Sequence, residues 1–412
     1  MNTSNEFAGL AIPGRLSLRI LGKVFLYIYI IISYVSCSEI IPSALNTLSL
    51  YALIGVTVLY AIYTHFRAIN NRYFIWYFVF LISSVISALF AEMLFGYDDW
   101  WGSVYQIIVC LVLCFALLNF VENKYEVKQV GIAYIIGAVL LFLLLYVTNS
   151  LHAESRLGEA VMGNANTFAT MYMTALIYAI WLAVFTKKIH LRAVLYTAIG
   201  VIFYALLLSG GRKFIIAPLI FLYGLLILKT DKRGRRKIIK ATFISGGIVA
   251  IVWILIMNNP MLYEIIGYRF VVILRQLSGE TISSNASSFI RARMIELAYK
   301  GGWSSPVWGH GFDTFKYLCK EQLGRYQYSH NNWTEMWYNG GVIGIVIYYY
   351  MYLKIAFQGR NLLRSDQEAG LFSIAGIISI FIFEYGGVTY CTYPIQMIIC
   401  LMYLMTTFKI EL

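Results

Sequence analysis

Hydrophobic residues form long uninterrupted stretches along the whole chain, with short polar segments between them. Such stretches are long enough to cross a hydrocarbon core of about 30 Å as helices. A transmembrane barrel would instead show short segments of alternating hydrophobicity. We therefore predict an all-α polytopic membrane protein of about 12 transmembrane helices. The predicted spans are 20–37, 47–63, 73–94, 104–121, 129–148, 166–186, 193–208, 214–228, 241–257, 333–353, 369–387 and 393–408.

One connection, 258–332, is much longer than the others and divides the chain into three parts. The first nine predicted helices lie in 1–257 and the last three in 333–412. The connection contains an amphipathic run at 269–277, suited to lying on a membrane surface, and a helix-like run at 289–303. Long loops in compact proteins are usually functional, so we expect an extracytoplasmic loop subdomain here, between spans nine and ten.

Composition and charge support this class of protein. Hydrophobic residues make up 60% of the chain and charged residues only 13%, whereas soluble chains carry about 25% charged residues. The net charge of +12 could indicate a nucleic-acid partner, but its placement favours a topology signal. Lys and Arg gather in alternate connections, at 67–72, 187–192 and 229–240, while 38–46 and 95–103 have none. Both termini are then expected in the cytoplasm, and no nucleic-acid partner is expected.

Four polar residues on the extracytoplasmic side work against this charge pattern: Arg156, Arg212, Arg291 and His330. Each has a simple structural explanation, because arginines can reach lipid headgroups and a histidine can be an ordinary interfacial residue. Together they suggest more. Arginine binds phosphate with two parallel hydrogen bonds, and histidine accepts a proton from a hydroxyl near neutral pH. The set predicts a reaction on a phosphate-linked lipid.

The start of the tenth predicted span also carries polar residues. Asn332 and Glu335 have the spacing of a capping box, so Glu335 is either a helix cap or an orienting partner of His330. Gly340 and Gly344 form a small-xxx-small pattern that predicts close approach of another helix. Motifs typical of metal sites, such as HExxH or DxD, are absent from the sequence, so we expect no metal and no cofactor.

The segment from Arg291 to Gly344 resembles the signature region of the O-antigen polymerases (Wzy type) and O-antigen ligases. The residues that carry the resemblance are Arg291, Ile295, the turn 306–311, Phe315, 329–331, Glu335 and 340–341, with Arg156, 163–166 and 209–212 upstream. Ala165 stands where the family often has proline, and His310 is not a family position. The first 150 residues resemble the family only in hydropathy.

This resemblance implies a GT-C-like, metal-independent glycosyltransferase with a donor glycan on undecaprenyl pyrophosphate. Arg156, Arg212 and Arg291 would hold the pyrophosphate, and His330 would activate the acceptor hydroxyl. The expected substrate-binding residues are Tyr328, Asn331, Glu335, Asn166 and Lys213.

The predicted function is that of a Wzy-type polysaccharide polymerase in a bacterial cytoplasmic (inner) membrane, with its active site facing the periplasm or exterior. It would transfer the lipid-linked glycan onto a lipid-linked repeat unit, among membrane lipids, with a chain-length regulator and a flippase as further partners. The nearest alternative is an O-antigen ligase that passes the glycan to lipid A–core, and a transferase acting on protein is more remote. A flippase or transporter of lipid-linked sugars is the alternative from another class.

Overall fold

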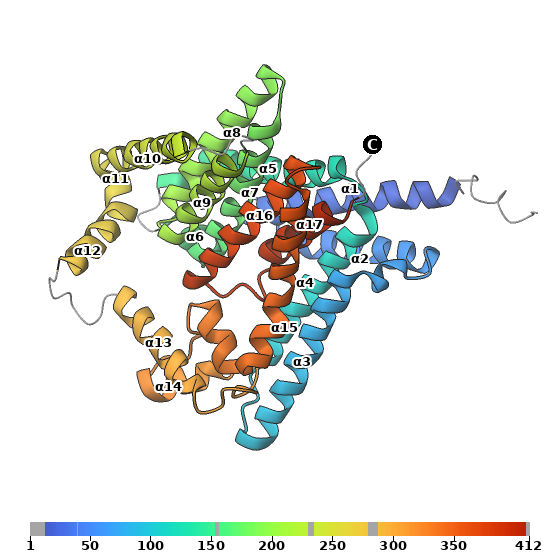
Figure 1. The fold of residues 1–412 in the computed structure, drawn as a ribbon, viewed down its shortest axis with the longest axis vertical. Coiled ribbons are helices and arrows are strands. Elements are labelled where there is room, and N and C mark those ends of the chain that lie inside the picture. Colours follow the sequence, from blue (N-terminus) through green and yellow to red (C-terminus); the bar gives the residue numbers. More distant parts are fainter. Residues whose placement is uncertain (1–12, 39, 153–155, 230–234, 279–286, 409–412) are drawn as a thin grey trace, which may run out of the picture.

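The computed structural model describes residues 13–38, 40–152, 156–229, 235–278 and 287–408, and within these ranges the chain is helical and has no strand (Figure 1). The long helices are α1 (Pro13–Val35), α2 (Ala44–Tyr63), α3 (Arg72–Phe95), α4 (Trp101–Phe120), α5 (Lys124–Val147), α7 (Ala165–Phe185), α8 (Ile189–Leu208), α9 (Arg212–Leu228), α10 (Arg235–Asn258), α15 (Asn332–Leu362), α16 (Gln367–Phe383) and α17 (Tyr393–Thr407). Shorter helices are α6 (Leu157–Met162), α11 (Pro260–Leu262), the π-helix η3 (Tyr263–Gly267), α12 (Tyr268–Leu277), α13 (Ser287–Gly302) and α14 (Phe315–Leu323), with 3₁₀ turns η1 (Arg67–Asn70), η2 (Ser150–His152) and η4 (Glu384–Gly386).

Each predicted span overlaps one of these twelve helices, although the bounds differ and the tenth span is interrupted. In the described part of the chain, ten helices are long and apolar enough to cross a membrane. The other two predicted spans are the shorter helices α9 and α17, of 17 and 15 residues. The prediction of an all-α polytopic membrane protein is confirmed.

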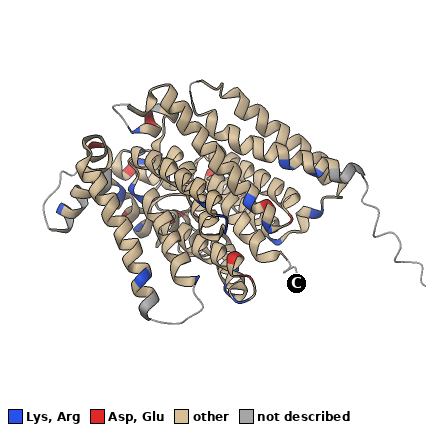
Figure 2. Ribbon diagram, turned by 90° about the horizontal axis from the view of Figure 1, so that it is seen from above, with Lys and Arg blue, Asp and Glu red and all other residues tan. Residues whose placement is uncertain are grey.

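Contacts between the helix connections define two faces of the molecule. On one face, the amide of Asp99, after α3, donates to the Tyr317 hydroxyl of α14 at 2.9 Å, and Lys213 of α9 donates to the Gly386 carbonyl after α16. On the opposite face, Lys128 of α5 pairs with Glu368 of α16 at 2.9 Å. We call the first the loop face, because α11 to α14 belong to it. Figure 2 shows charged residues mainly near helix ends and connections, with long uncharged stretches between them.

The helices differ in how far the protein encloses them. In α7, 89% of the residues in its most apolar 18-residue stretch are buried, whereas in α10, which lies at the edge of the molecule, 6% are (Figure 1). The predicted basic run at 229–240 precedes and enters α10, and its residues 230–234 lie outside the described part of the chain. α13 and α14 share a small core of their own with Tyr338 of α15, formed by Met294, Ala298, Phe315 and Cys319.

The tenth predicted span begins where expected but is interrupted. α15 consists of two helical segments, 332–340 and 342–362, joined at Gly341 with φ +58° and ψ −155°. The side-chain Nδ2 of Asn332 donates to the Tyr349 hydroxyl at 3.0 Å, although 17 residues of straight helix would separate their backbones by about 25 Å. The first segment therefore folds back along the second.

This reversal corrects the expected role of Gly340 and Gly344. A Cβ at Gly340 would meet open space, and one at Gly344 would meet only Met336 of the same helix. The close approach occurs at Gly341 instead, where a Cβ would lie 2.5 Å from the Val307 carbonyl oxygen. The turn 306–311 packs into the break, and the Val342 amide donates to the Pro306 carbonyl at 2.9 Å.

Candidate active site

The short break between α8 and α9 brings three separate elements together. Arg156, before α6, donates from Nε to the Ser209 carbonyl at 2.8 Å and pairs with Glu159 at 3.0 Å. Gly210 has φ +66°, and a Cβ there would lie 3.0 Å from the Ile265 carbonyl oxygen and 3.2 Å from Arg156 Nε. Glycine at this position thus lets Arg156, the α8–α9 hairpin and η3 meet.

The first turn of α9 carries two cations that contact other connections. Arg212 donates from Nη1 to the carbonyl of Arg269 in α12. Lys213 donates to the Gly386 carbonyl, and its ammonium lies 4.9 Å from the centre of the Phe214 ring and 5.4 Å from that of Phe383. Both side chains are thereby held at the loop face.

Arg269 and Arg291 complete a group of positive charges. Burial lowers the pKa of each guanidinium, and the nearby charge of Arg156 lowers both further. Each stays charged, because arginine does not lose its proton in proteins. We call Arg156, Arg212, Lys213, Arg269 and Arg291 the cationic cluster. Among the described residues, Arg156 alone of the five has an acidic ion-pair partner, so the cluster carries uncompensated positive charge.

His330 lies beside this cluster in the loop before α15. Its backbone has φ +61°, a conformation that is uncommon for a residue with a side chain. The centre of its ring lies 4.4 Å from the centre of the Tyr328 ring. Burial, together with the nearby charges of Arg291 and Lys213, lowers the pKa of His330 to about 3. No hydrogen-bond partner of its imidazole is found in the described part of the chain. The ring is therefore neutral at physiological pH.

Glu335 supports the loop rather than capping α15 with Asn332. The N-cap is Asn331, whose Oδ1 accepts from the Thr334 amide at 3.0 Å, so the predicted capping box is wrong. Glu335 is 1% exposed and accepts from the amide of Ser329 at 2.6 Å and from Asn339 at 3.3 Å. Glu335 makes no hydrogen bond to His330 in this structure, but it holds Ser329, the residue directly before His330.

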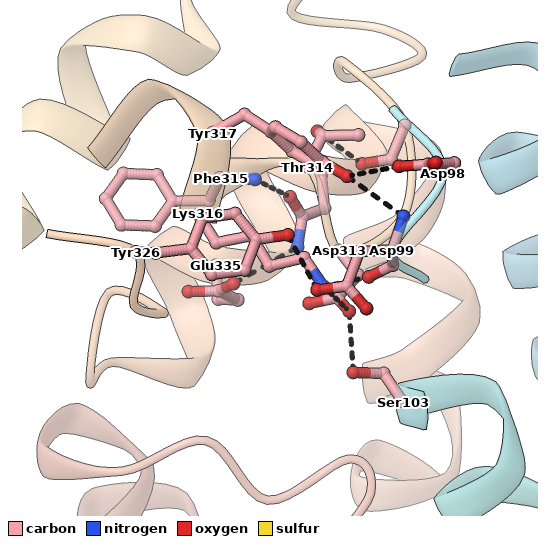
Figure 3. Close-up of polar contacts among 12 residues, drawn as sticks. Asp98, Asp99, Ser103, Asp313, Thr314, Phe315, Lys316, Tyr317, Tyr326 and Glu335 are labelled. Carbon is pink, nitrogen blue, oxygen red and sulfur yellow. Dashed lines mark hydrogen bonds and ion pairs between the residues drawn. The ribbon is translucent and has the colours of Figure 1, made fainter. Parts of the chain in front are cut away.

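A second polar network contacts the chain before His330, at Asp313 and Tyr326 (Figure 3). Asp313 accepts from Ser103 of α4 at 2.7 Å and from Lys316 of α14 at 2.8 Å. The Tyr326 hydroxyl donates to Asp99 at 2.8 Å, and this hydrogen bond lowers the pKa of the Asp99 carboxyl. These contacts tie the loop between α3 and α4 to α14. They also tie it to the segment that leads to Tyr328 and His330.

The structure brings most of the predicted site residues together. The group contains Arg156, Arg212, Lys213, Arg291, Tyr328 and His330. Asn331 and Glu335 are each 1% exposed. They hold the loop around His330 in place through their hydrogen bonds to the amides of Thr334 and Ser329. Asn166 stands apart at the start of α7, where its amide donates to Asn164 at 2.9 Å and its side chain has no hydrogen bond to the group in the structure as described.

Arg269 was missed as a site residue. Its sequence signal was a charge at the start of the apolar run 269–277, which we interpreted as a surface helix. Within the described residues, no group of three or more His, Cys, Asp or Glu side chains could hold a metal ion. The cationic cluster, by contrast, has the chemistry of a phosphate site.

Residues 197–349 match the family model described as O-antigen ligase. The matched segment includes Arg212, Arg269, Arg291 and His330, while Arg156 lies before it. No curated protein matches the chain at a significant level. Over this segment, which is less than half of the chain, the protein is similar to the O-antigen ligase family.

Proposed function

We propose that the protein transfers a glycan from a polyprenyl-diphosphate donor to an acceptor hydroxyl at its loop face, which we place outside the cytoplasm. The observation that carries this proposal is a neutral histidine beside a cluster of cations with little acidic compensation. Undecaprenyl diphosphate is the donor that the sequence resemblance implies.

The cationic cluster would bind the diphosphate of the donor. Its guanidinium groups offer hydrogen bonds in a planar fork, and their partial burial strengthens the attraction for an anion. As the bond between the anomeric carbon and the diphosphate breaks, negative charge builds on the leaving oxygen. Cations already held in place stabilise that charge in the transition state.

His330 would take the proton from the acceptor hydroxyl while the hydroxyl oxygen attacks the anomeric carbon. The neutral imidazole is in the correct form, but a pKa of about 3 makes it a weak base in the free protein. Binding of the diphosphate would offset the charges of Arg291 and Lys213. The pKa of His330 would then rise, so the donor would itself activate the base.

We favour a polymerase, in which the acceptor is another lipid-linked repeat unit, and the chain-length regulator and flippase remain proposed partners. The second candidate is a ligase that transfers the glycan to lipid A–core, and the description of the matching family favours it. Purified protein incubated with a defined lipid-linked repeat separates the two. A polymerase makes a ladder of longer glycans from this substrate alone, whereas a ligase requires its second acceptor.

The site assignment is tested in the same assay with single substitutions. His330→Ala and Arg291→Ala are each expected to lower the transfer rate by about 100-fold or more, in the range for loss of a general base or a charge-stabilising group. Arg293→Ala is the matched control, because Arg293 lies on the same helix, is exposed and pairs with Glu296 at 2.7 Å. Transfer at the wild-type rate by the His330 variant would overturn the assignment.

A further inference from the structure

A cavity of about 730 Å³ lies between α3, the turn 304–312 and both segments of α15 around the break at Gly341. Its size falls within the range of small-molecule sites in proteins. None of its lining residues is Lys, Arg, Asp or Glu, and none belongs to the cationic cluster. The cavity is therefore separate from the proposed diphosphate site.

The two ends of this cavity differ in chemistry. One wall consists of α3 side chains that are exposed on the surface of a predicted span, namely Ile86, Phe90, Leu94 and Phe95. Such side chains contact lipid, so this side opens to the hydrocarbon of the bilayer. At the other end lie Ser304 and His310, with His310 Nε2 2.9 Å from the Ser304 hydroxyl, and the exposed ring of Trp308. The cavity thus suits an amphiphile with a hydrocarbon chain.

A single short helix separates this cavity from His330. Met336, Asn339 and Gly340 of the segment 332–340 line the cavity, while Glu335 of the same segment holds Ser329 beside His330. A molecule in the cavity with its polar end at the turn 304–310 would present that end at the loop face, where the proposed reaction takes place.

We propose that this cavity binds the hydrocarbon chain of the lipid-linked acceptor, an inference that rests on the proposed function. Transfer between two lipid-linked substrates requires two lipids at once, and the cationic cluster accounts for the diphosphate of one. The uncharged cavity holds the second by its chain, and apolar contact with the α3 wall supplies the affinity.

The test fills the cavity by substituting Gly340. A Cβ at Gly340 meets open space, so Gly340→Leu adds a side chain to the cavity without an initial clash. The matched control is Gly55→Leu in α2, where a Cβ also meets open space. Both variants are checked for thermal unfolding. Their labelling by a polyprenyl-phosphate probe with a photoreactive chain is then compared with that of the wild type.

We expect the probe to label α3 between Ile86 and Phe95 in the wild type and in Gly55→Leu, and to lose most of that label in Gly340→Leu. With a preformed long-chain donor, the KM for a short lipid-linked acceptor should rise by roughly tenfold or more in Gly340→Leu, as for a filled apolar pocket. The KM for the donor should stay at its wild-type value.

Undiminished labelling of Gly340→Leu, or displacement of the probe by phospholipid at equal concentration, would overturn the proposal. Labelling does not depend on catalysis, so the two proposals fail separately. Wild-type protein that is labelled on α3 but transfers no glycan would refute the proposed function and leave chain binding in the cavity supported.

Discussion

At the scale of single residues, the proposed mechanism depends on how charge and burial act on His330. Its imidazole lies among buried groups beside Arg291 and Lys213, and this environment favours the uncharged ring. Glu335 accepts a hydrogen bond from the backbone amide of Ser329, directly before His330. The ring of Tyr328 packs against the His330 imidazole. We therefore expect the protonation of His330 to change when an anion binds nearby, and not when the pH varies around neutrality.

This environment predicts an unusual pH dependence. An ordinary histidine base loses activity as pH falls through about 6.5. His330 has a lowered pKa and stays neutral far below that value, so kcat/KM, which reports the free enzyme, should show no loss centred near pH 6.5 from this group. The fall in kcat should occur at higher pH than any fall in kcat/KM, because in the proposed mechanism bound diphosphate raises the pKa of His330.

Initial rates between pH 5 and 8 and an NMR titration of the His330 ring, assigned with His330→Gln, check this expectation. Added inorganic diphosphate should raise the titration midpoint. A midpoint near 6.5 in the free protein would contradict it.

At the scale of elements, the loop and the site are positioned by the reversal within α15. The combination of φ and ψ at Gly341 is essentially restricted to glycine, and the turn 306–311 occupies the space beside it. The first segment returns toward Tyr349 and brings Asn331 and His330 with it. Two distant parts of the chain, the turn and the helix, thereby define one site.

Gly341→Ala is therefore expected to be costly. The strained backbone alone costs about 1–3 kcal/mol, and the new Cβ would lie 2.5 Å from the Val307 carbonyl oxygen. We expect a Tm several degrees lower and a large loss of transfer. Gly200→Ala in α8 is the control, because a Cβ there meets open space and alanine favours helix. Equal Tm values for the two variants would show that the reversal is not under strain.

At the scale of the whole molecule, a buried polar network joins the last three long helices. Glu384, fully buried, accepts from the hydroxyls of Tyr349 at 2.8 Å, Tyr352 at 2.6 Å and Tyr348 at 3.2 Å, and from Thr389. The amide nitrogen of Thr389 in turn donates to Asn332 at 3.0 Å. The network therefore connects the start of α15 to the α16–α17 connection, whose Gly386 carbonyl holds Lys213.

Removal of the central carboxylate should destabilise this arrangement. Glu384→Ala removes the acceptor that four hydroxyls share, and the contacts of Tyr348 with Tyr352 and Thr389 replace it only in part. Each buried group left unsatisfied costs about 1–3 kcal/mol. Thermal unfolding in detergent should show a clear fall in Tm, with a smaller fall for Glu384→Gln, which keeps one acceptor oxygen. Glu321→Ala, at an exposed position of α14, serves as the control and should leave Tm unchanged. A Tm equal to that of the control would exclude a structural role for Glu384.

Much of the fold and part of the site could be predicted from the sequence, because both depend on local properties. The long apolar stretches determine helices that cross a membrane, since such segments must satisfy their backbone hydrogen bonds internally. Arg156, Arg212, Arg291 and His330 could be singled out because charged or titratable groups at the edge of an apolar stretch are costly. Each of these features is visible within a few neighbouring residues.

Tertiary structure alone decided how these residues meet. Arg269 joins the cationic cluster only because α12 lies against the start of α9, and Glu335 turns to Ser329 only because the chain reverses at Gly341. The cavity beside α3 has walls from three separate segments of the chain. The sequence by itself determined which residues carry unusual charge and where helices form. Contacts between distant segments, which no local pattern encodes, determined the site that those residues build.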